Sequence, residues 1–323
     1  MIRLIYDKMD TGNSRSKENK ETSGDDMKAF FENRSYSTEI PVSASFAENM
    51  DFVAHWHTDI EMLYVCEGSI GVGINSERRV LHKGEIAICG SNDIHYYESG
   101  EMTSRIILVI FKPEILTSFK NWPKNLMPCS VFMDGEFYAA WKTDLEVLDT
   151  FKNIFHQINA EMAQKKDLYP AFASLRIYEL FLTLFRHFPG YFSDSGKIPA
   201  GLRTPADITP MQKAIKYLEG NYTRDITLER ISREVNLSRF YFSRLFKKTT
   251  GLNLNAYLSR IRVEKAAALI QETRRPIIEI AYETGFCSIR TFNRAFKGIK
   301  GYAPQSLRHM ERDTDREATS GGF

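Results

Sequence analysis

The chain has 323 residues, of which 43% are hydrophobic and 26% are charged. A chain of this length and apolar content can bury two hydrophobic cores, so we expect two domains. It contains no apolar run near the roughly 20 residues that a bilayer-crossing helix needs, and its N-terminus lacks the apolar stretch of a signal peptide. We therefore expect a cytoplasmic protein without a membrane segment.

The net charge of +2 conceals an uneven distribution of charge along the chain. Residues 205–312 carry 20 Lys and Arg against 10 Asp and Glu, whereas residues 1–204 carry 22 against 28. A basic C-terminal part is typical of a domain that binds a polyanion. The four cysteines are scattered without a C-x-x-C pair, which argues against a zinc cluster or a disulfide framework.

The N-terminal part of the chain divides into a polar segment and a strand-rich segment. Residues 7–28 are polar and charged with almost nothing to bury, so we expect residues 1–28 to be disordered. Between about Phe30 and Phe111, short apolar runs alternate with Gly, Asn and charged pairs, at the spacing of strands in an all-β domain. No helical pattern separates these runs. They predict an antiparallel sandwich or small barrel within a domain of residues 29–188.

Three histidines and a glutamate form a spaced pattern in this strand-rich segment. His55, His57 and Glu61 precede Gly68, and His95 follows a second glycine-containing stretch. The pattern resembles the two sequence motifs of the cupin barrel, although the second motif lacks its usual Pro-x-Gly. The resemblance implies that the four side chains converge inside the barrel, where cupin enzymes hold a divalent metal ion.

Two interpretations of this pattern are open. The four side chains bind a metal ion, or they form a polar cluster that hydrogen-bonds a small ligand. We favour the second interpretation, with effector-binding residues and neither a metal ion nor another cofactor. The effector-binding set is His55, His57, Glu61 and His95. Nearby aromatic residues, Tyr97 among them, either stack on a sugar or simply pack in the domain.

After residue 141 the apolar spacing changes to that of helices. One segment repeats apolar residues from Leu145 to Met162, and a second repeats them from Phe172 through Leu175 and Leu182. Together they predict a helical hairpin. Its apolar surface either pairs two protomers or only caps the barrel, and we favour dimerisation. Residues 189–208 hold prolines, glycines and few large apolar residues, so we expect a linker.

The basic part of the chain, residues 209–312, contains one pattern twice, at 227–251 and 276–301. Thr209 followed by Pro210 predicts the start of a first helix, and Thr227 and Ser238 predict the N-caps of the next two. The second copy begins its last helix at Ser288. Between the copies, residues 255–271 lack Gly and Pro and predict a helix of about 25 Å. A helix of that length can seat two recognition helices roughly 34 Å apart, which is one turn of DNA.

The last helix of each copy has an apolar face and a polar face. In the first copy, Phe242, Leu245 and Phe246 share the apolar face, and in the second, Phe292 and Phe296 do so. The opposite face of each helix is suited to the major groove of DNA. The candidate DNA-binding residues are Phe240, Ser243, Arg244 and Lys247 in the first copy and Arg290, Asn293, Arg294 and Lys297 in the second.

The doubled pattern resembles the DNA-binding domain of AraC/XylS-type transcriptional regulators. The shared features include Phe-Lys-x3-Gly endings, from Phe246 to Gly251 and from Phe296 to Gly301, and the following Pro304. The resemblance implies base contacts from the outward residues of both helices. It also implies an N-terminal effector-binding and dimerisation domain, so it covers nearly the whole chain.

We therefore expect an α+β protein of two domains. An antiparallel β cupin-like barrel with a helical hairpin precedes an all-α domain with a paired helix-turn-helix, and residues 313–323 form a disordered tail. The expected function is that of a homodimeric transcriptional regulator that binds promoter DNA and senses a small polar effector such as a carbohydrate. If it activates transcription, RNA polymerase is a further partner. The alternative is a metal-dependent cupin enzyme fused to a DNA-targeting module, although no other catalytic constellation is evident in the sequence.

Overall fold

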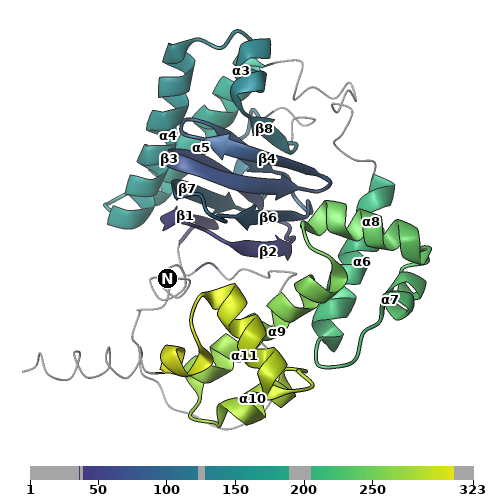
Figure 1. Cartoon of the computed structure of the whole chain (residues 1–323). Helices are drawn as coiled ribbons and strands as arrows, with labels where there is room; N and C mark the ends of the chain where they lie inside the picture. The colour runs from purple at the N-terminus through teal and green to yellow at the C-terminus, as the bar shows by residue number, and fades with distance from the viewer. Residues whose placement is uncertain (1–35, 37–38, 123–127, 189–204, 309–323) are drawn as a thin grey trace, which may run out of the picture. The chain divides into compact units, whose positions relative to one another are not determined.

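The computed structural model describes residue 36 and residues 39–122, 128–188 and 205–308. The chain divides into two compact units between Ile208 and Thr209 (Figure 1). The expected disordered segments 1–28 and 313–323 lie outside the described residues, as does most of the expected linker. None of the helices in the described ranges combines the length and the apolar character that are needed to cross a membrane.

The first unit is built on eight strands whose pairings are all antiparallel. This confirms the expected antiparallel β domain. The strands are β1 (Val42–Glu48), β2 (Phe52–His55), β3 (Ile60–Ile74), β4 (Glu77–His82), β5 (Ile86–Cys89), β6 (His95–Glu98), β7 (Ser104–Phe111) and β8 (Val131–Met133).

Strand β3, which has 15 residues, belongs to two layers. Its first half pairs with β7 and β5, and its second half pairs with β4 and β6. The register against β7 shifts between Val65 and Glu67, and such a bulge bends a strand and reverses which side chains face inward. The buried inner residues accordingly change from Leu63 and Val65 to Ile70 and Val72.

The sequence predicted a sandwich or small barrel, and the described strands form two half-sheets whose ring is not closed. The order β1-β7-β3-β5-β8 ends at β1 and β8, while β2 pairs only with β6 and β4 only with β3. Closing a barrel requires every strand to have two neighbours. Strands β2, β5 and β6 have 4 residues each and β8 has 3.

Within the described residues of this unit, four helices accompany the sheet, and the longest two form the expected hairpin. They are α2 (Glu114–Thr117), α3 (Gly135–Ala140), α4 (Leu145–Gln164) and α5 (Tyr169–His187). Helices α4 and α5 share a buried core with the outer face of β1, β3 and β7. In that core, Tyr64 of β3 stacks on Phe155 of α4 at 5.3 Å between ring centroids, and Phe111 meets the edge of Phe181 at 5.9 Å.

The apolar stripe predicted on α5 is not the face that packs on the sheet. The side chains that pack on the sheet include Ile177, Leu180 and Phe181, whereas Leu175 and Leu182 are exposed. Helix α5 therefore has apolar residues on two faces, and one of them packs on the sheet.

The second unit is helical throughout its elements. Its helices are α6 (Pro205–Asn221), α7 (Leu228–Glu234), α8 (Arg239–Thr250), α9 (Leu254–Glu272), α10 (Ile277–Glu283) and α11 (Ile289–Lys300). The predicted start of the first helix at Pro210 is wrong, since α6 begins at Pro205 and Pro210 lies inside it. Pro205 suits a first helical position, where no N–H donor is needed, and Pro210 removes only one backbone hydrogen bond.

The two copies of the sequence pattern have the same local structure. Ser238 and Ser288 each accept a hydrogen bond from the backbone N–H three residues later, as predicted for N-caps. The turn before each of these helices places one residue in the left-handed region, Asn236 at φ 57° and Gly285 at φ 90°. Asn and Gly are the residues that adopt this conformation most easily, which explains their positions in the pattern.

Candidate functional site

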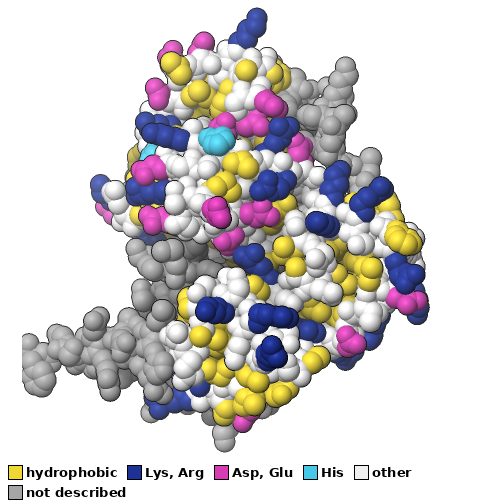
Figure 2. Space-filling model, in the orientation of Figure 1, with side chains coloured by type: hydrophobic (Ala, Val, Ile, Leu, Met, Phe, Trp, Pro, Cys, Tyr) yellow, Lys and Arg dark blue, Asp and Glu magenta, His cyan; other side chains and the backbone are white. Residues whose placement is uncertain are grey.

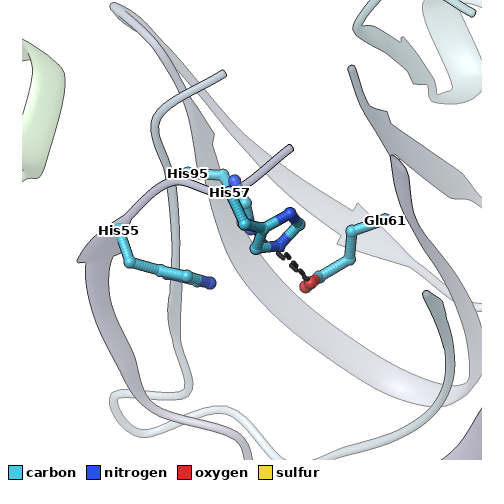
Figure 3. A group of neighbouring side chains, drawn as sticks. All are labelled: His55, His57, Glu61 and His95. Atoms are coloured by element: carbon cyan, nitrogen blue, oxygen red, sulfur yellow. Dashed lines mark hydrogen bonds and ion pairs between the residues drawn. The ribbon is translucent and has the colours of Figure 1, made fainter. Parts of the chain in front are cut away.

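The three histidines and the glutamate of the sequence pattern converge inside the first unit. His55 ends β2 and pairs in register with His95 at the start of β6, while Glu61 is the second residue of β3. His57 lies between β2 and β3, and the side chains of all four residues are at most 1% exposed. Their potential ligand atoms lie within 4.8 Å of one another, and Figure 3 shows the rings and the carboxylate directed toward a common centre. We call this group the polar cluster.

Each histidine of the polar cluster is oriented by the backbone. The Nδ1 atoms of His55, His57 and His95 lie 3.0, 3.0 and 2.9 Å from carbonyl oxygens. The acceptors belong to Val53, Asp59 and Asp93. A carbonyl oxygen only accepts, so each Nδ1 carries the proton and donates it. When a ring is neutral, its Nε2 atom is therefore the one with the lone pair.

The carboxylate of Glu61 divides its two oxygens between different partners. The hydroxyl of Tyr97 donates to Oε1 at 2.5 Å. Oε2 lies 3.1 Å from Nε2 of His57 and 3.6 Å from Nε2 of His95. Burial raises the pKa of Tyr97 well above its ordinary value, and the nearby charge of Glu61 raises it further. The phenol therefore remains a hydrogen-bond donor.

Sequence reasoning assigned Tyr97 to packing or sugar stacking and missed this contact. A signal was available, because His95 and Tyr97 are two residues apart on one strand, and strand residues at that spacing point to the same face. A polar side chain two residues from such a histidine on the same strand can therefore hydrogen-bond the other members of a polar cluster.

A second set of candidate residues lies on α8 and α11. The predicted inward residues Phe242, Phe246, Phe292 and Phe296 are buried. The predicted outward residues are all exposed, namely Phe240, Ser243, Arg244, Lys247, Arg290, Asn293, Arg294 and Lys297. Phe240 is 86% exposed, which is unusual for a phenylalanine side chain. The structure thus exposes both sets at the surface of the second unit, one set on α8 and one on α11.

Positive charge surrounds these helix faces. Figure 2 shows Lys and Arg side chains gathered on the visible face of the helical unit, with few Asp and Glu among them. The sequence of residues 205–312 has the same excess, 20 basic against 10 acidic residues. A surface of this kind attracts a polyanion over several ångströms, before any specific contact forms.

The two copies are held together by contacts that the sequence did not reveal. Arg262 of α9 donates from Nε to the carbonyl of Tyr222 at 2.7 Å and from Nη2 to that of Arg224 at 2.8 Å. Its guanidinium also lies over the ring of Phe286, 5.9 Å from the centroid. Residues Tyr222 and Arg224 belong to the loop between α6 and α7, and Phe286 belongs to the turn between α10 and α11. Backbone acceptors in loops have no sequence signature, so these contacts were not predictable.

Two family models match the chain, one in each unit. A model described as an AraC-like ligand binding domain matches residues 41–181, and a model described as a helix-turn-helix domain matches residues 231–310. The polar cluster lies within the first range, and the exposed faces of α8 and α11 lie within the second. A ligand-binding domain followed by a helix-turn-helix domain defines a ligand-responsive transcriptional regulator.

One curated relative and two solved structures are similar to different shares of the chain. The HTH-type transcriptional activator RhaR of Salmonella schwarzengrund strain CVM19633 is 26% identical over 267 residues, which cover 82% of this chain and 89% of RhaR. Among solved structures, ToxT from Vibrio cholerae O395 is similar with a TM-score of 0.41 and 13% identity, over 84% of this chain and 98% of ToxT. The C-terminal domain of AraT, a response regulator from Geobacillus stearothermophilus, is 33% identical over 33% of this chain and 86% of that domain, with a TM-score of 0.30. The chain belongs to the AraC family of transcriptional regulators.

Proposed function

We propose that the chain regulates transcription by binding promoter DNA through two helix-turn-helix motifs, α7–α8 and α10–α11. One observation supports this most strongly. The same capped helix, with buried phenylalanines on one face and exposed polar or basic residues on the other, occurs twice in the basic unit. Two such helices joined by α9, which has 19 residues, suit adjacent major grooves on one side of a duplex.

The proposed base contacts come from the exposed residues near the start of each recognition helix. Arg244, Arg290 and Arg294 offer bidentate donors for guanine, and Asn293 suits adenine. Phe240 offers apolar surface for the methyl group of thymine, and Ser243 a hydroxyl for either donor or acceptor. Lys247 and Lys297, one turn further along, are proposed to contact phosphates, which position the protein without reading sequence.

The first unit is proposed to sense the effector and to pair two copies of the chain. The polar cluster of His55, His57, Glu61 and His95 is the proposed site for a small polar effector such as a carbohydrate. The unused apolar face of α5 is the proposed dimer surface. Its exposed residues are Leu168, Phe172, Leu175 and Leu182. In this scheme residues 29–188 form the sensing and dimerisation domain, 189–208 the linker and 209–312 the DNA-binding domain.

The remaining partners follow from the proposed regulation. RhaR is named a transcriptional activator. We propose that this chain also activates transcription and therefore contacts RNA polymerase at its promoters. We also propose that it acts in the cytoplasm. A metal-dependent cupin enzyme fused to a DNA-targeting module is the second candidate, favoured only by the four convergent donor side chains. Recovery of a small molecule that the full chain converts, rather than binds and releases unchanged, would support the enzyme.

DNA selection followed by binding titrations tests the proposed function. The full chain is first used to select duplexes from a random pool, and affinities for the selected duplex and a scrambled one are then measured by fluorescence anisotropy. Arg244→Ala and Arg294→Ala should each lower the affinity for the selected duplex by about 1–3 kcal/mol and leave the scrambled duplex nearly unaffected. Lys247→Ala should weaken both duplexes alike and reduce the salt dependence by about one counterion.

A matched control removes an arginine elsewhere in the same unit. Arg233 is exposed on α7, outside both proposed recognition helices. Arg233→Ala should therefore leave the ratio of selected to scrambled affinity unchanged. Unaltered ratios in both Arg244→Ala and Arg294→Ala would refute the assignment of α8 and α11 as the reading helices.

A further inference from the structure

We infer that the polar cluster holds one divalent transition-metal ion. The sequence alone favoured a cluster without a metal, and the arrangement of the four side chains in the structure raises the question again. The inference concerns the same site that is proposed above for effector sensing. It depends on three features of the geometry, which are the direction of the lone pairs, the size of the space between them and the side chains behind them.

The first feature is that four electron-pair donors point at one centre. Because the Nδ1 protons of His55, His57 and His95 are used on backbone carbonyls, the three Nε2 atoms face the centre with lone pairs. The Glu61 carboxylate directs Oε2 toward the same centre, 3.1 Å from one of these nitrogens and 3.6 Å from another. Lone pairs at such distances repel one another unless a cation or a proton lies between them. A single metal ion interacts favourably with all four donors at once.

The second feature is the size of the space. The four potential ligand atoms lie within 4.8 Å of one another. Ligands at about 2.1 Å from a metal are separated by about 3.0–3.4 Å when they are adjacent and about 4.2 Å when they are opposite. The observed separations need only small rotations to match these values. Atoms this close leave room between them for a single ion.

The third feature is the set of side chains and carbonyls behind the ligands. Metal-binding histidines almost always donate their second ring N–H to a carbonyl or carboxylate, which fixes the ring and its tautomer. All three histidines do so here. Tyr97 occupies Oε1 of Glu61 at 2.5 Å, so the carboxylate offers the centre one oxygen. Three imidazoles and one carboxylate oxygen suit manganese, iron, cobalt, nickel or zinc, and not calcium or magnesium.

Four protein ligands also suit a sensing site. A six-coordinate ion with these ligands keeps two positions for water or for oxygen atoms of a small polar effector. The chain's own residues would then fix the ion and its orientation, while the effector would be recognised through its hydroxyl or carboxylate oxygens. This step rests on the proposed function, whereas the metal site itself does not.

Metal binding is measured on the full chain. Protein is treated with a chelator, dialysed, and titrated anaerobically with Mn(II), Fe(II), Co(II), Ni(II) and Zn(II) in turn. Metal content is read by mass spectrometry, affinity by competition with a chromophoric chelator, and ligand type by the visible absorption of Co(II). Unfolding is followed by tryptophan fluorescence, since all three tryptophans lie in the first unit. We expect one equivalent of at least one of these metals and a higher melting temperature when it is bound.

Variants separate this site from adventitious binding. His57→Gln and His95→Gln should abolish the stoichiometric binding. Tyr97→Phe keeps the ring and removes the hydroxyl behind Glu61, so it should lower the affinity 10- to 100-fold with the stoichiometry unchanged. His82 lies at the exposed end of β4, away from the polar cluster, and His82→Gln should bind like the wild type.

The outcomes also separate this inference from the proposed function. Wild-type protein that takes up none of the five metals stoichiometrically would overturn the inference, even if the glutamine variants fail to fold. One equivalent that survives in folded His57→Gln and His95→Gln would overturn it as well. Specific DNA binding is measured in parallel on the same samples. Wild-type protein that binds one metal ion but does not bind DNA specifically would refute the proposed function and leave the metal site intact.

Discussion

Replacing Gly285 by alanine is expected to weaken the second unit more than the same replacement at Gly301. Gly285 lies in the turn between α10 and α11 with φ 90°. A Cβ atom there would lie 2.8 Å from Cα of Thr223 and 2.9 Å from the carbonyl oxygens of Thr223 and Tyr222. These two residues belong to the loop between α6 and α7. The turn of one helix pair therefore packs directly on the loop that leads into the other.

The structure separates two contributions to the expected cost. An alanine in the left-handed region costs about 1–2 kcal/mol at either glycine. Gly301 has φ 81° and no neighbouring atom within 4 Å of an added Cβ, so it bears only this cost. At Gly285 the neighbouring atoms are backbone and cannot rotate away, which adds about 1–3 kcal/mol for the displacement of one segment. We expect a loss of about 2–5 kcal/mol at Gly285.

Hydrogen exchange on the full chain measures this difference. Wild type, Gly285→Ala and Gly301→Ala are compared by mass spectrometry, using peptides from α9, α10 and α11, and the exchange rates give local unfolding free energies. Affinity for a selected DNA duplex is measured on the same samples. Gly285→Ala should lose more protection and more affinity than Gly301→Ala. Equal losses in the two variants would refute the view that packing at Gly285 fixes one helix pair against the other.

Two further predictions concern contacts within and between chains. Arg262→Met keeps the apolar stem but removes both hydrogen bonds to the loop carbonyls, so it should lower the unfolding free energy of the second unit by about 1–3 kcal/mol. The exposed Arg274→Met should change it little, and equal effects in denaturation monitored by circular dichroism would contradict this role of Arg262. Leu175→Glu with Leu182→Glu should give a folded monomer in sedimentation velocity, since both residues lie on the exposed apolar face of α5. Ile278→Glu, an exposed apolar change in the second unit, should leave the dimer intact, and a wild type that is already monomeric at micromolar concentration would contradict the proposed dimer surface.

The helical unit was predictable from sequence because its signals are local. Thr227, Ser238 and Ser288 each cap a helix within three residues of themselves. Asn236 and Gly285 mark the two turns by their preference for positive φ. The error at the start of α6 has the same local character, because Pro205 and Pro210 both suit a first helical position and the sequence pattern does not distinguish between them.

The open sheet and the buried face of α5 were not predictable, because both depend on distant parts of the chain. Alternation along β3 indicates a strand but not that a bulge near residue 66 divides it between two half-sheets. Helix α5 has apolar residues nearly all round, so its sequence permits either face to pack on the sheet. The outer face of β1, β3 and β7 determines which face of α5 is buried. Phe181 and Leu184 pack in that core, and Leu175 does not.

The polar cluster shows how far a motif alone can be taken. Its four residues were identified from spacing, but spacing leaves open which nitrogen of each ring carries a proton, and that choice separates a hydrogen-bonding cluster from a set of metal ligands. The carbonyls of Val53, Asp59 and Asp93 make the choice, and their positions depend on backbone geometry that the motif does not contain.

Strand β3 also links the polar cluster to the hairpin. Glu61 faces the cluster, while its neighbours Met62 and Tyr64 face the core shared with α4 and α5. Tyr64 stacks on Phe155 of α4, so the carboxylate and the helix are connected through one strand over three residues. A packed core moves as a unit rather than deforming continuously, so a displacement of Glu61 along the strand normal must be accommodated by the hairpin. Sensing and pairing, as proposed for the first unit, are therefore linked through β3, which carries Glu61 on one face and packs on the hairpin with the other.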